Sequence, residues 1–187
     1  MDDLAVVPTE DAYPFVRRYT SDGEAVWTKQ APSTPRGRAY AVAIDADQNI
    51  YVGGTQSNPA WLRSYNENGA ELWTIGPDAP GGGCNGCDAV YGVAVDGDGR
   101  LVVAAGLDGT TDGDTWVASL TSAGDASWSD LVDYGGQDYP YALGVDAAGD
   151  IYFLIQSSTA VAIEKRSSDG SVLWHLDGPV GAGYSVN

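Results

Sequence analysis

The sequence predicts an all-β fold of four similar units, each a four-stranded antiparallel sheet. An acidic or polar turn that contains a glycine runs four times into a short strand ending in tryptophan. These tryptophans are separated by 46, 55 and 46 residues, a period typical of stacked supersecondary units. Gly numbers 25 and Asp far outnumbers Glu, which favours turns and strands over helices. The repeated tryptophans are Trp27, Trp73, Trp128 and Trp174.

Each unit contains four segments with the period-two alternation of short strands. The first segment begins at a repeated tyrosine and reads YAVAID, YGVAVD or YALGVD. After an Asp/Gly turn, the second reads NIYVGG, RLVVAAG or DIYFLI. The third is WLRSY, TWVASL or VAIEKR, and the fourth carries the tryptophan. The repeated tyrosines are Tyr40, Tyr91, Tyr141 and, in a truncated last segment, Tyr184.

The two ends of the chain carry complementary parts of one unit. LAVV, at residues 4–7, occupies the second-strand position, and YSVN at the other end is a first strand. Pairing the two would complete a sheet and cover two edges. We therefore predict a single β-propeller domain over residues 1–187, with four blades at about 184–187 plus 1–30, 38–76, 89–132 and 139–177. The alternatives are half of an eight-bladed ring formed by a dimer and an open arc of a larger propeller.

The repeat pattern Asp-x-x-Gly-Asn-(Ile/Leu)-Tyr-Val-x-Gly, followed by Gly-x-x-x-Trp, resembles the bacterial β-propeller repeat of the SBBP-like type. Its Gly-x-x-x-Trp part is also similar to the tryptophan-docking repeat of quinoprotein propellers. The resemblance covers nearly the whole chain and implies a β-propeller. Its motifs are structural, so it carries no catalytic residue over to this sequence.

The net charge of -17 disfavours nucleic acids and anionic membranes as partners, because their phosphates would be repelled. The N-terminal residues show no signal peptide, and no apolar run reaches the length of a transmembrane helix. We expect a soluble chain of unknown compartment, with an extracellular or virion surface as one setting.

Two insertions flank the third unit and predict an interaction face. The path from Trp73 to Tyr91 is 5 residues longer than that from Trp27 to Tyr40, and the loop before Trp116 is 4 residues longer than its counterpart. In a propeller both loops lie on one face, and loops extended on a rigid scaffold often bind partners. Tolerated surface insertion is the alternative. The candidates for this face are Cys84, Asn85, Cys87, Asp108, Thr111, Asp112 and Asp114.

The insertions also hold the only cysteines and an acidic loop. Cys84 and Cys87 form a C-x-x-C motif. The alternatives for this pair are a short disulfide, two free thiols, and shared metal or redox chemistry. A zinc site would need two further ligands, which the surrounding sequence does not supply. Asp108, Asp112 and Asp114 could offer oxygen ligands to calcium, although the full order of a calcium loop is absent. No other cofactor is expected.

No nucleophile with an adjacent base is evident, and the sequence has a single histidine. The tryptophan and tyrosine columns recur once per unit, which favours packing between blades over ligand binding. We therefore expect a non-enzymatic scaffold or binding module that presents a face near the third blade to a protein or glycan. A structural role in an extracellular or phage virion assembly, as a homodimer or as part of a larger assembly, fits this expectation. The alternatives are a quinone-dependent dehydrogenase or lyase completed by a partner chain, and a carbohydrate-binding propeller.

Overall fold

The computed structural model describes residues 4–7, 14–30, 37–56, 60–76, 87–107, 113–157 and 161–178. All regular structure in these ranges is β-strand, in four antiparallel sheets that we call blades 1 to 4. Blade 1 contains β1 (Leu4–Val7), β2 (Phe15–Tyr19) and β3 (Ala25–Gln30); blade 2 contains β4 (Gly37–Ile44), β5 (Ile50–Gln56), β6 (Ala60–Tyr65) and β7 (Glu71–Ile75). Blade 3 contains β8 (Cys87–Val95), β9 (Leu101–Leu107), β10 (Asp114–Leu120) and β11 (Ala126–Val132); blade 4 contains β12 (Tyr139–Val145), β13 (Ile151–Gln156), β14 (Val161–Arg166) and β15 (Val172–Asp177).

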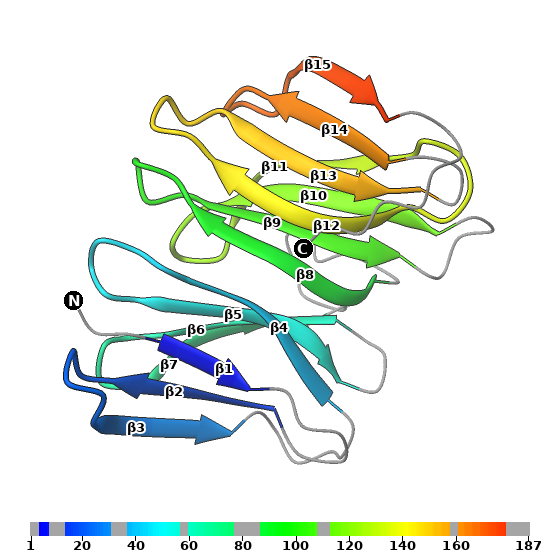
Figure 1. Ribbon diagram of the computed structural model, residues 1–187. Coiled ribbons are helices and arrows are strands. Elements are labelled where there is room, and N and C mark those ends of the chain that lie inside the picture. Colours follow the sequence, from blue (N-terminus) through cyan, green and yellow to red (C-terminus); the bar gives the residue numbers. More distant parts are fainter. Residues whose placement is uncertain are drawn as a thin grey trace.

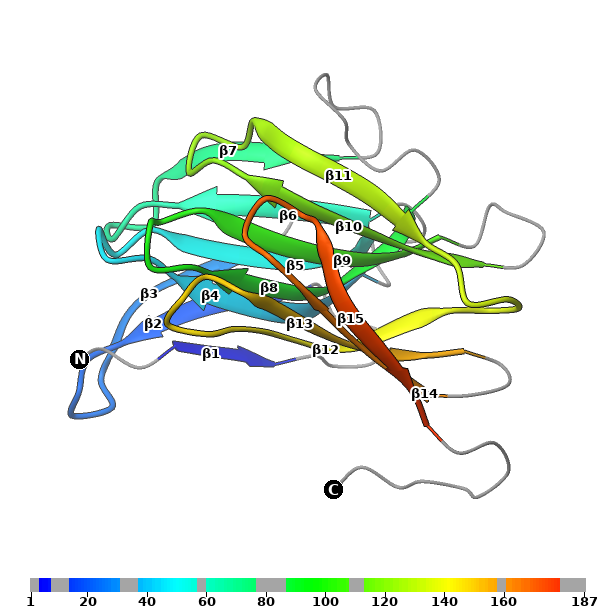
Figure 2. The ribbon, with the colours of Figure 1, turned by 90° about the horizontal axis from the view of Figure 1, so that it is seen from above.

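The blades follow one another in chain order as a fan. In Figure 1, blade 1 lies at the bottom and blade 4 at the top, with blades 2 and 3 between them. Figure 2 shows the inner strands β4 and β8 on one side of these two blades and the outer strands β7 and β11 on the other. The fan is therefore an arc in which the described parts of blades 1 and 4 form the two ends.

The predicted segments coincide closely with the observed strands because alternation and turn residues are local signals. Residues 4–7 form β1, as the repeat spacing predicts, and β1 pairs with β2. Residues 184–187, the predicted first strand of blade 1, lie outside the described residues. In the described ranges, no helix has the length and apolar character needed to cross a membrane.

The hairpins between the first and second strands of blades 2, 3 and 4 share one aspartate-based turn. The carboxylate of Asp45 accepts a hydrogen bond from the backbone N–H of Asn49 at 2.8 Å. Asp96 and Asp146 accept the same i+4 bond from residues 100 and 150. These acids replace missing backbone partners in the turn, which explains their recurrence in each of these blades.

The repeated tyrosines mark bulges in the inner strands. The pairing register shifts between Ala39 and Ala41, so Tyr40 is the extra residue of β4. Tyr91 and Tyr141 occupy the same bulge position in β8 and β12. A bulge leaves one residue out of the ladder and redirects its side chain. Tyr40 and Tyr141 accordingly remain 41% and 62% exposed although they lie on inner strands.

The repeated tryptophans join each blade to the next. Trp27 Nε1 donates to the carbonyl of Glu67 in blade 2 at 2.9 Å. Trp73 donates to Ser122 in blade 3 at 2.8 Å, and Trp128 donates to Ser168 in blade 4 at 3.0 Å. Each acceptor lies two residues before the glycine of the turn between the third and fourth strands. The column therefore serves packing between blades.

The apolar core also lies between blades. One cluster combines Tyr51 and Leu62 of blade 2 with Leu101, Val103 and Leu120 of blade 3. A second lies between blades 1 and 2, and a third between blades 3 and 4. Burial of apolar surface contributes roughly 25 cal/mol per Å², so lateral contact between sheets is the main source of stability.

A buried ion-pair network adds to the contact between blades 3 and 4. Arg166 Nε donates to Glu164 Oε1 at 2.5 Å, and both side chains are about 5% exposed or less. Arg166 Nη1 also donates to Asp130 of β11 at 2.7 Å, and the Tyr134 hydroxyl donates to the second Glu164 oxygen. The network therefore connects β14 with β11 and with the segment that follows it.

The turn glycines provide a matched test of tryptophan docking. Gly170 has φ +89°, and a Cβ built on it would lie 2.7 Å from the Trp128 ring. Gly23 has φ +81° but no atom within 4 Å of such a Cβ. We expect Gly170→Ala to lose about 1–3 kcal/mol more unfolding free energy than Gly23→Ala. Both variants place alanine in a left-handed backbone conformation, which destabilises each of them, but only Gly170→Ala also overpacks the interface with Trp128. Urea denaturation at low protein concentration measures both; equal losses would show that the ring does not constrain the turn.

Candidate cation site between the third and fourth blades

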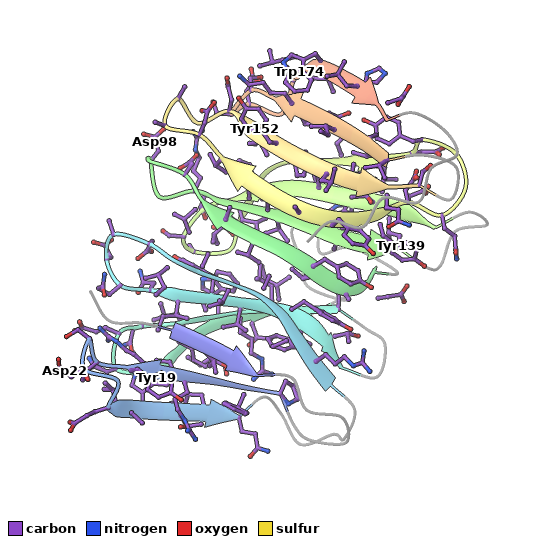
Figure 3. The ribbon with its side chains drawn as sticks, viewed as in Figure 1. Tyr19, Asp22, Asp98, Tyr139, Tyr152 and Trp174 are labelled. Atoms are coloured by element: carbon purple, nitrogen blue, oxygen red, sulfur yellow. The ribbon has the colours of Figure 1, made fainter. Side chains whose placement is uncertain are left out.

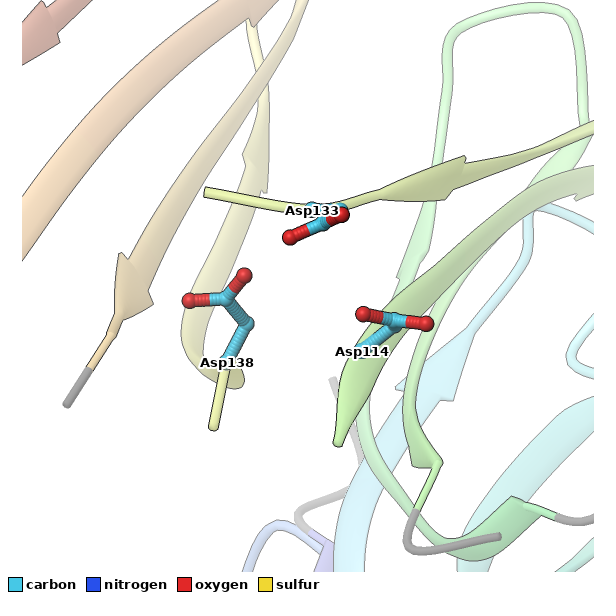
Figure 4. A group of neighbouring side chains, drawn as sticks. All are labelled: Asp114, Asp133 and Asp138. Atoms are coloured by element: carbon cyan, nitrogen blue, oxygen red, sulfur yellow. The ribbon is translucent and has the colours of Figure 1, made fainter. Parts of the chain in front are cut away.

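Three aspartates meet where the connection entering blade 4 crosses the start of β10. Asp133 and Asp138 lie in this connection, and Asp114 is the first residue of β10. One carboxylate oxygen from each lies within 4.8 Å of the other two (Figure 4). Residues separated by up to 24 positions thus converge at one end of the blade 3 to blade 4 junction.

The connection takes this shape because of its glycines and its hydrogen bonds. Gly135 and Gly136 have φ of +83° and +81°, a region that glycine enters without steric cost. The Asp133 side chain accepts from the N–H of Gly135 at 2.7 Å. The N–H of Asp138 donates to the Gly113 carbonyl at 2.6 Å, which ties the connection to the residue before β10. The carboxylates are therefore held by ordered backbone on both sides.

Asp138 is the buried member of the cluster. It is 1% exposed, and one oxygen accepts from the Tyr134 N–H at 2.5 Å. The other oxygen has no hydrogen-bond partner in the part of the chain that the structure describes. Burial raises the pKa of Asp138; the Tyr134 hydrogen bond opposes this shift, and the negative charges of Asp133 and Asp114 add to it. An unpaired buried carboxylate is costly, so a proton or a cation at this oxygen would stabilise the site.

The arrangement suits a hard cation with oxygen ligands. Calcium takes carboxylate and carbonyl oxygens at 2.3–2.6 Å, so two of its ligands lie at most about 5 Å apart. The spacing of the three carboxylates satisfies this limit. Zinc prefers nitrogen and sulfur ligands, and the cluster offers neither.

Only one of the predicted calcium ligands is placed in this cluster. Asp114 belongs to it, whereas Asp108, Thr111 and Asp112 lie outside the described residues. Cys84 and Asn85 also lie outside them; Cys87 begins β8, but its side chain is not described. The disulfide, the interaction face and the other two calcium ligands therefore remain predictions.

Sequence reasoning missed Asp133 and Asp138. The signal available was the segment DYGGQD, in which two acids flank a glycine turn in the connection entering a blade. Such connections lie on the same face as the loop between the second and third strands, where Asp114 was already a candidate. Combining these two facts would have placed all three acids together.

Comparisons with known proteins show the fold and no family. No family model matches the sequence, and no curated protein resembles it closely enough to be a relative. Among solved structures, the chain is similar to the Dos1 propeller, with 12% identity and a TM-score of 0.62 over 89% of this chain and 43% of that chain. The fold is a β-propeller.

A second similar structure is a eukaryotic initiation factor, with 10% identity and a TM-score of 0.53 over 94% of this chain and 54% of that one. The propeller thus spans about half the length of each of these two chains. At such identities the likeness concerns the fold alone.

Proposed function

We propose that this chain is a non-enzymatic propeller module that binds a calcium-type cation between blades 3 and 4 and presents the surrounding loops to a partner. The buried, unpartnered Asp138 oxygen beside two further carboxylates is the observation that carries this proposal. The two positive charges of calcium would offset most of the negative charge of the three carboxylates and fix the connection entering blade 4 against the start of β10. The ion's role is to order a surface.

The partner surface extends from this site to the predicted loops. Asp114 directly follows the loop that contains Asp108, Thr111 and Asp112. Cys84 and Asn85 precede β8 in the sequence, and Cys87 is the first residue of that strand. We assign these residues to the rim of the surface, with a protein or a glycan as the partner. We extend the proposal to a structural role in an extracellular or virion assembly, and the tryptophan contacts between blades support the scaffold part of it.

Calcium is expected to stabilise the protein through this site. At a free calcium concentration one hundred times the Kd, linkage gives about 2.7 kcal/mol of added unfolding free energy. Calorimetric titration and thermal unfolding of calcium-free protein, with and without calcium chloride, measure the heat and the shift. Asp138→Asn should abolish both effects.

The matched control is Asp125→Asn, which removes one negative charge from the turn at the opposite end of β10. It should leave the calcium response intact. An unchanged response in Asp138→Asn, or no heat in the native protein, would refute the cation site. Magnesium chloride in the same assay distinguishes a calcium-type site from general screening of the acidic surface.

Without calcium, Asp138 should make stability depend on pH. Its folded-state pKa lies above the unfolded value, so the folded protein binds more protons between those two values. Its contribution to stability therefore falls as pH rises through this interval. Asp138→Asn should remove that dependence, as measured by urea unfolding at a series of pH values; a decline that persists unchanged in the variant would assign it to other groups.

A further inference from the structure

The exposed face of blade 4 has the side chains of a buried blade interface. It carries Tyr152, Ile163, Trp174 and Leu176, the last three of which are 43%, 41% and 62% exposed. The equivalent positions in blade 2 follow from the strand register, since Leu62 pairs with Ile75 as Ile163 pairs with Leu176. In blade 2 these positions face blade 3, and Tyr51 and Leu62 are 0% and 3% exposed there. We call this surface of blade 4 the trailing face.

The free side of blade 1 has the complementary residues. Val16 packs towards blade 2, so Phe15, Arg17 and Tyr19 alternate onto the other side of β2. They correspond to Trp61, Arg63 and Tyr65 of blade 2. In blade 1 the Cζ of Arg17 lies 5.5 Å from the centroid of the Phe15 ring, and in blade 2 the Cζ of Arg63 lies 5.7 Å from that of the Trp61 ring. Trp61 and Tyr65 are buried, whereas Phe15 and Tyr19 are half-buried. We call this side, with the turn at residues 20–24, the leading face.

The contact between blades 1 and 2 shows how such faces join. The ring centroid of Trp27 lies 6.3 Å from that of Tyr65, and Trp27 Nε1 donates to Glu67. A Cβ built on Gly69 would lie 2.9 Å from the same indole ring. In blade 1 the positions that correspond to Tyr65, Glu67 and Gly69 are Tyr19, Ser21 and Gly23. A Cβ built on Gly23 would meet no atom within 4 Å, so the space beside it is open. Trp174 is the one repeated tryptophan without a following blade in the described chain.

These two faces do not meet within one fan. Figure 3 shows Tyr152 and Trp174 at one end of the molecule and Tyr19 and Asp22 at the other. We propose that a second copy of this chain covers both faces: Trp174 of each copy docks on the turn at residues 20–24 of the other, and the two arcs close into one eight-bladed ring. Two such contacts related by a twofold axis form a closed assembly. The fan's likeness to only part of the Dos1 propeller, at 43% of that chain, agrees with an arc of a larger ring.

Charge also enters this contact. Lys165 lies directly opposite Trp174 in the register, as Arg18 lies opposite Trp27, and Arg18 donates to the Glu67 carbonyl at the internal junction. Lys165 Nζ is already paired within blade 4, at 2.7 Å from Asp150 Oδ2, so this cation does not offset Asp22 and Glu24 of the docking turn. Two chains of charge -17 repel each other, so we expect association to strengthen when salt screens this repulsion.

Sedimentation of the whole chain across a range of concentrations, in about 0.15 M and about 1 M salt, tests the proposal. We expect a species of twice the 19.5 kDa chain mass. Trp174→Ala should weaken dimer formation by at least tenfold and leave the circular dichroism spectrum unchanged, because Trp174 is exposed in the single chain. Leu131→Ala is the matched control: it removes a 54% exposed apolar side chain from the outer strand of blade 3, away from either end face.

Tryptophan fluorescence separates the remaining outcomes. In the proposed ring, emission of the native protein shifts to shorter wavelength as the dimer forms, and Trp174→Phe removes this shift. A monomer with Trp174 exposed at every concentration would overturn the proposal, as would a monomer with Trp174 buried, which would show closure within one chain. Trimers or open polymers would overturn the two-copy ring. None of these results depends on calcium, so the cation site is judged separately.

Discussion

Replacing Trp73 by alanine is expected to lower the unfolding free energy by about 3–5 kcal/mol, the range for truncating a large aromatic residue in a packed interior. The Trp73 ring packs on the cluster between blades 2 and 3 and lies 5.9 Å from the Tyr51 ring. Its Nε1 donates to Ser122, and a Cβ on Gly124 would meet the ring at 3.2 Å. Urea unfolding followed by circular dichroism measures the loss.

Two variants separate the contributions of this residue. Trp73→Phe keeps an aromatic ring in the interface and loses the hydrogen bond, so we expect a smaller loss, of which the bond accounts for about 1 kcal/mol. Trp174→Ala, measured at a concentration that keeps the chain monomeric, should cost much less than Trp73→Ala because no blade covers that ring in the fan. Similar losses for Trp73→Ala and Trp174→Ala would contradict the account of lateral packing.

Glu164→Ala is expected to cost about 3–5 kcal/mol, since it leaves Arg166 buried without its closest partner. The 2.5 Å bond between them and the link to Asp130 connect blades 3 and 4. Thermal and urea unfolding both report the loss. Because Glu164 also accepts from the Tyr134 hydroxyl, the segment before blade 4 should loosen in the same variant.

A double variant tests whether the buried charge causes this loss. Glu164→Leu combined with Arg166→Met replaces both ions by apolar side chains, and buried pairs replaced in this way often lose little stability. We expect the double variant to recover most of the stability lost in Glu164→Ala. A loss in Glu164→Ala below about 0.5 kcal/mol would place this residue with ordinary surface positions.

The strands and turns could be predicted from the sequence because their signals are local. Alternating side chains and glycine turns placed β5, β9 and β13 within one or two residues of the observed bounds. The repeated tyrosines were recognised as a column, but their bulge position depends on the register with the neighbouring strand, which sequence alone does not give. The Trp27 to Glu67 contact likewise required the relative placement of two blades.

Only one of the three acids of the candidate cation site could be predicted from the sequence, for the same reason. Asp114 carried a recognisable signal in its acidic loop. Asp133 and Asp138 join it through a backbone contact between Gly113 and Asp138, which lie in different segments of the chain. The burial of Asp138, on which the chemistry depends, is a property of that contact and not of the local sequence.

The docking of each repeated tryptophan on the turn of the next blade is the central claim, and hydrogen exchange of the indole Nε1–H groups tests it most directly. Proton–nitrogen NMR, with resonances assigned through single Trp→Phe variants, follows each group in deuterated buffer at a concentration that keeps the chain monomeric. We predict slow exchange for Trp27, Trp73 and Trp128, whose Nε1–H groups are bonded to Glu67, Ser122 and Ser168, and fast exchange for Trp174. Equally fast exchange of all four would contradict the account.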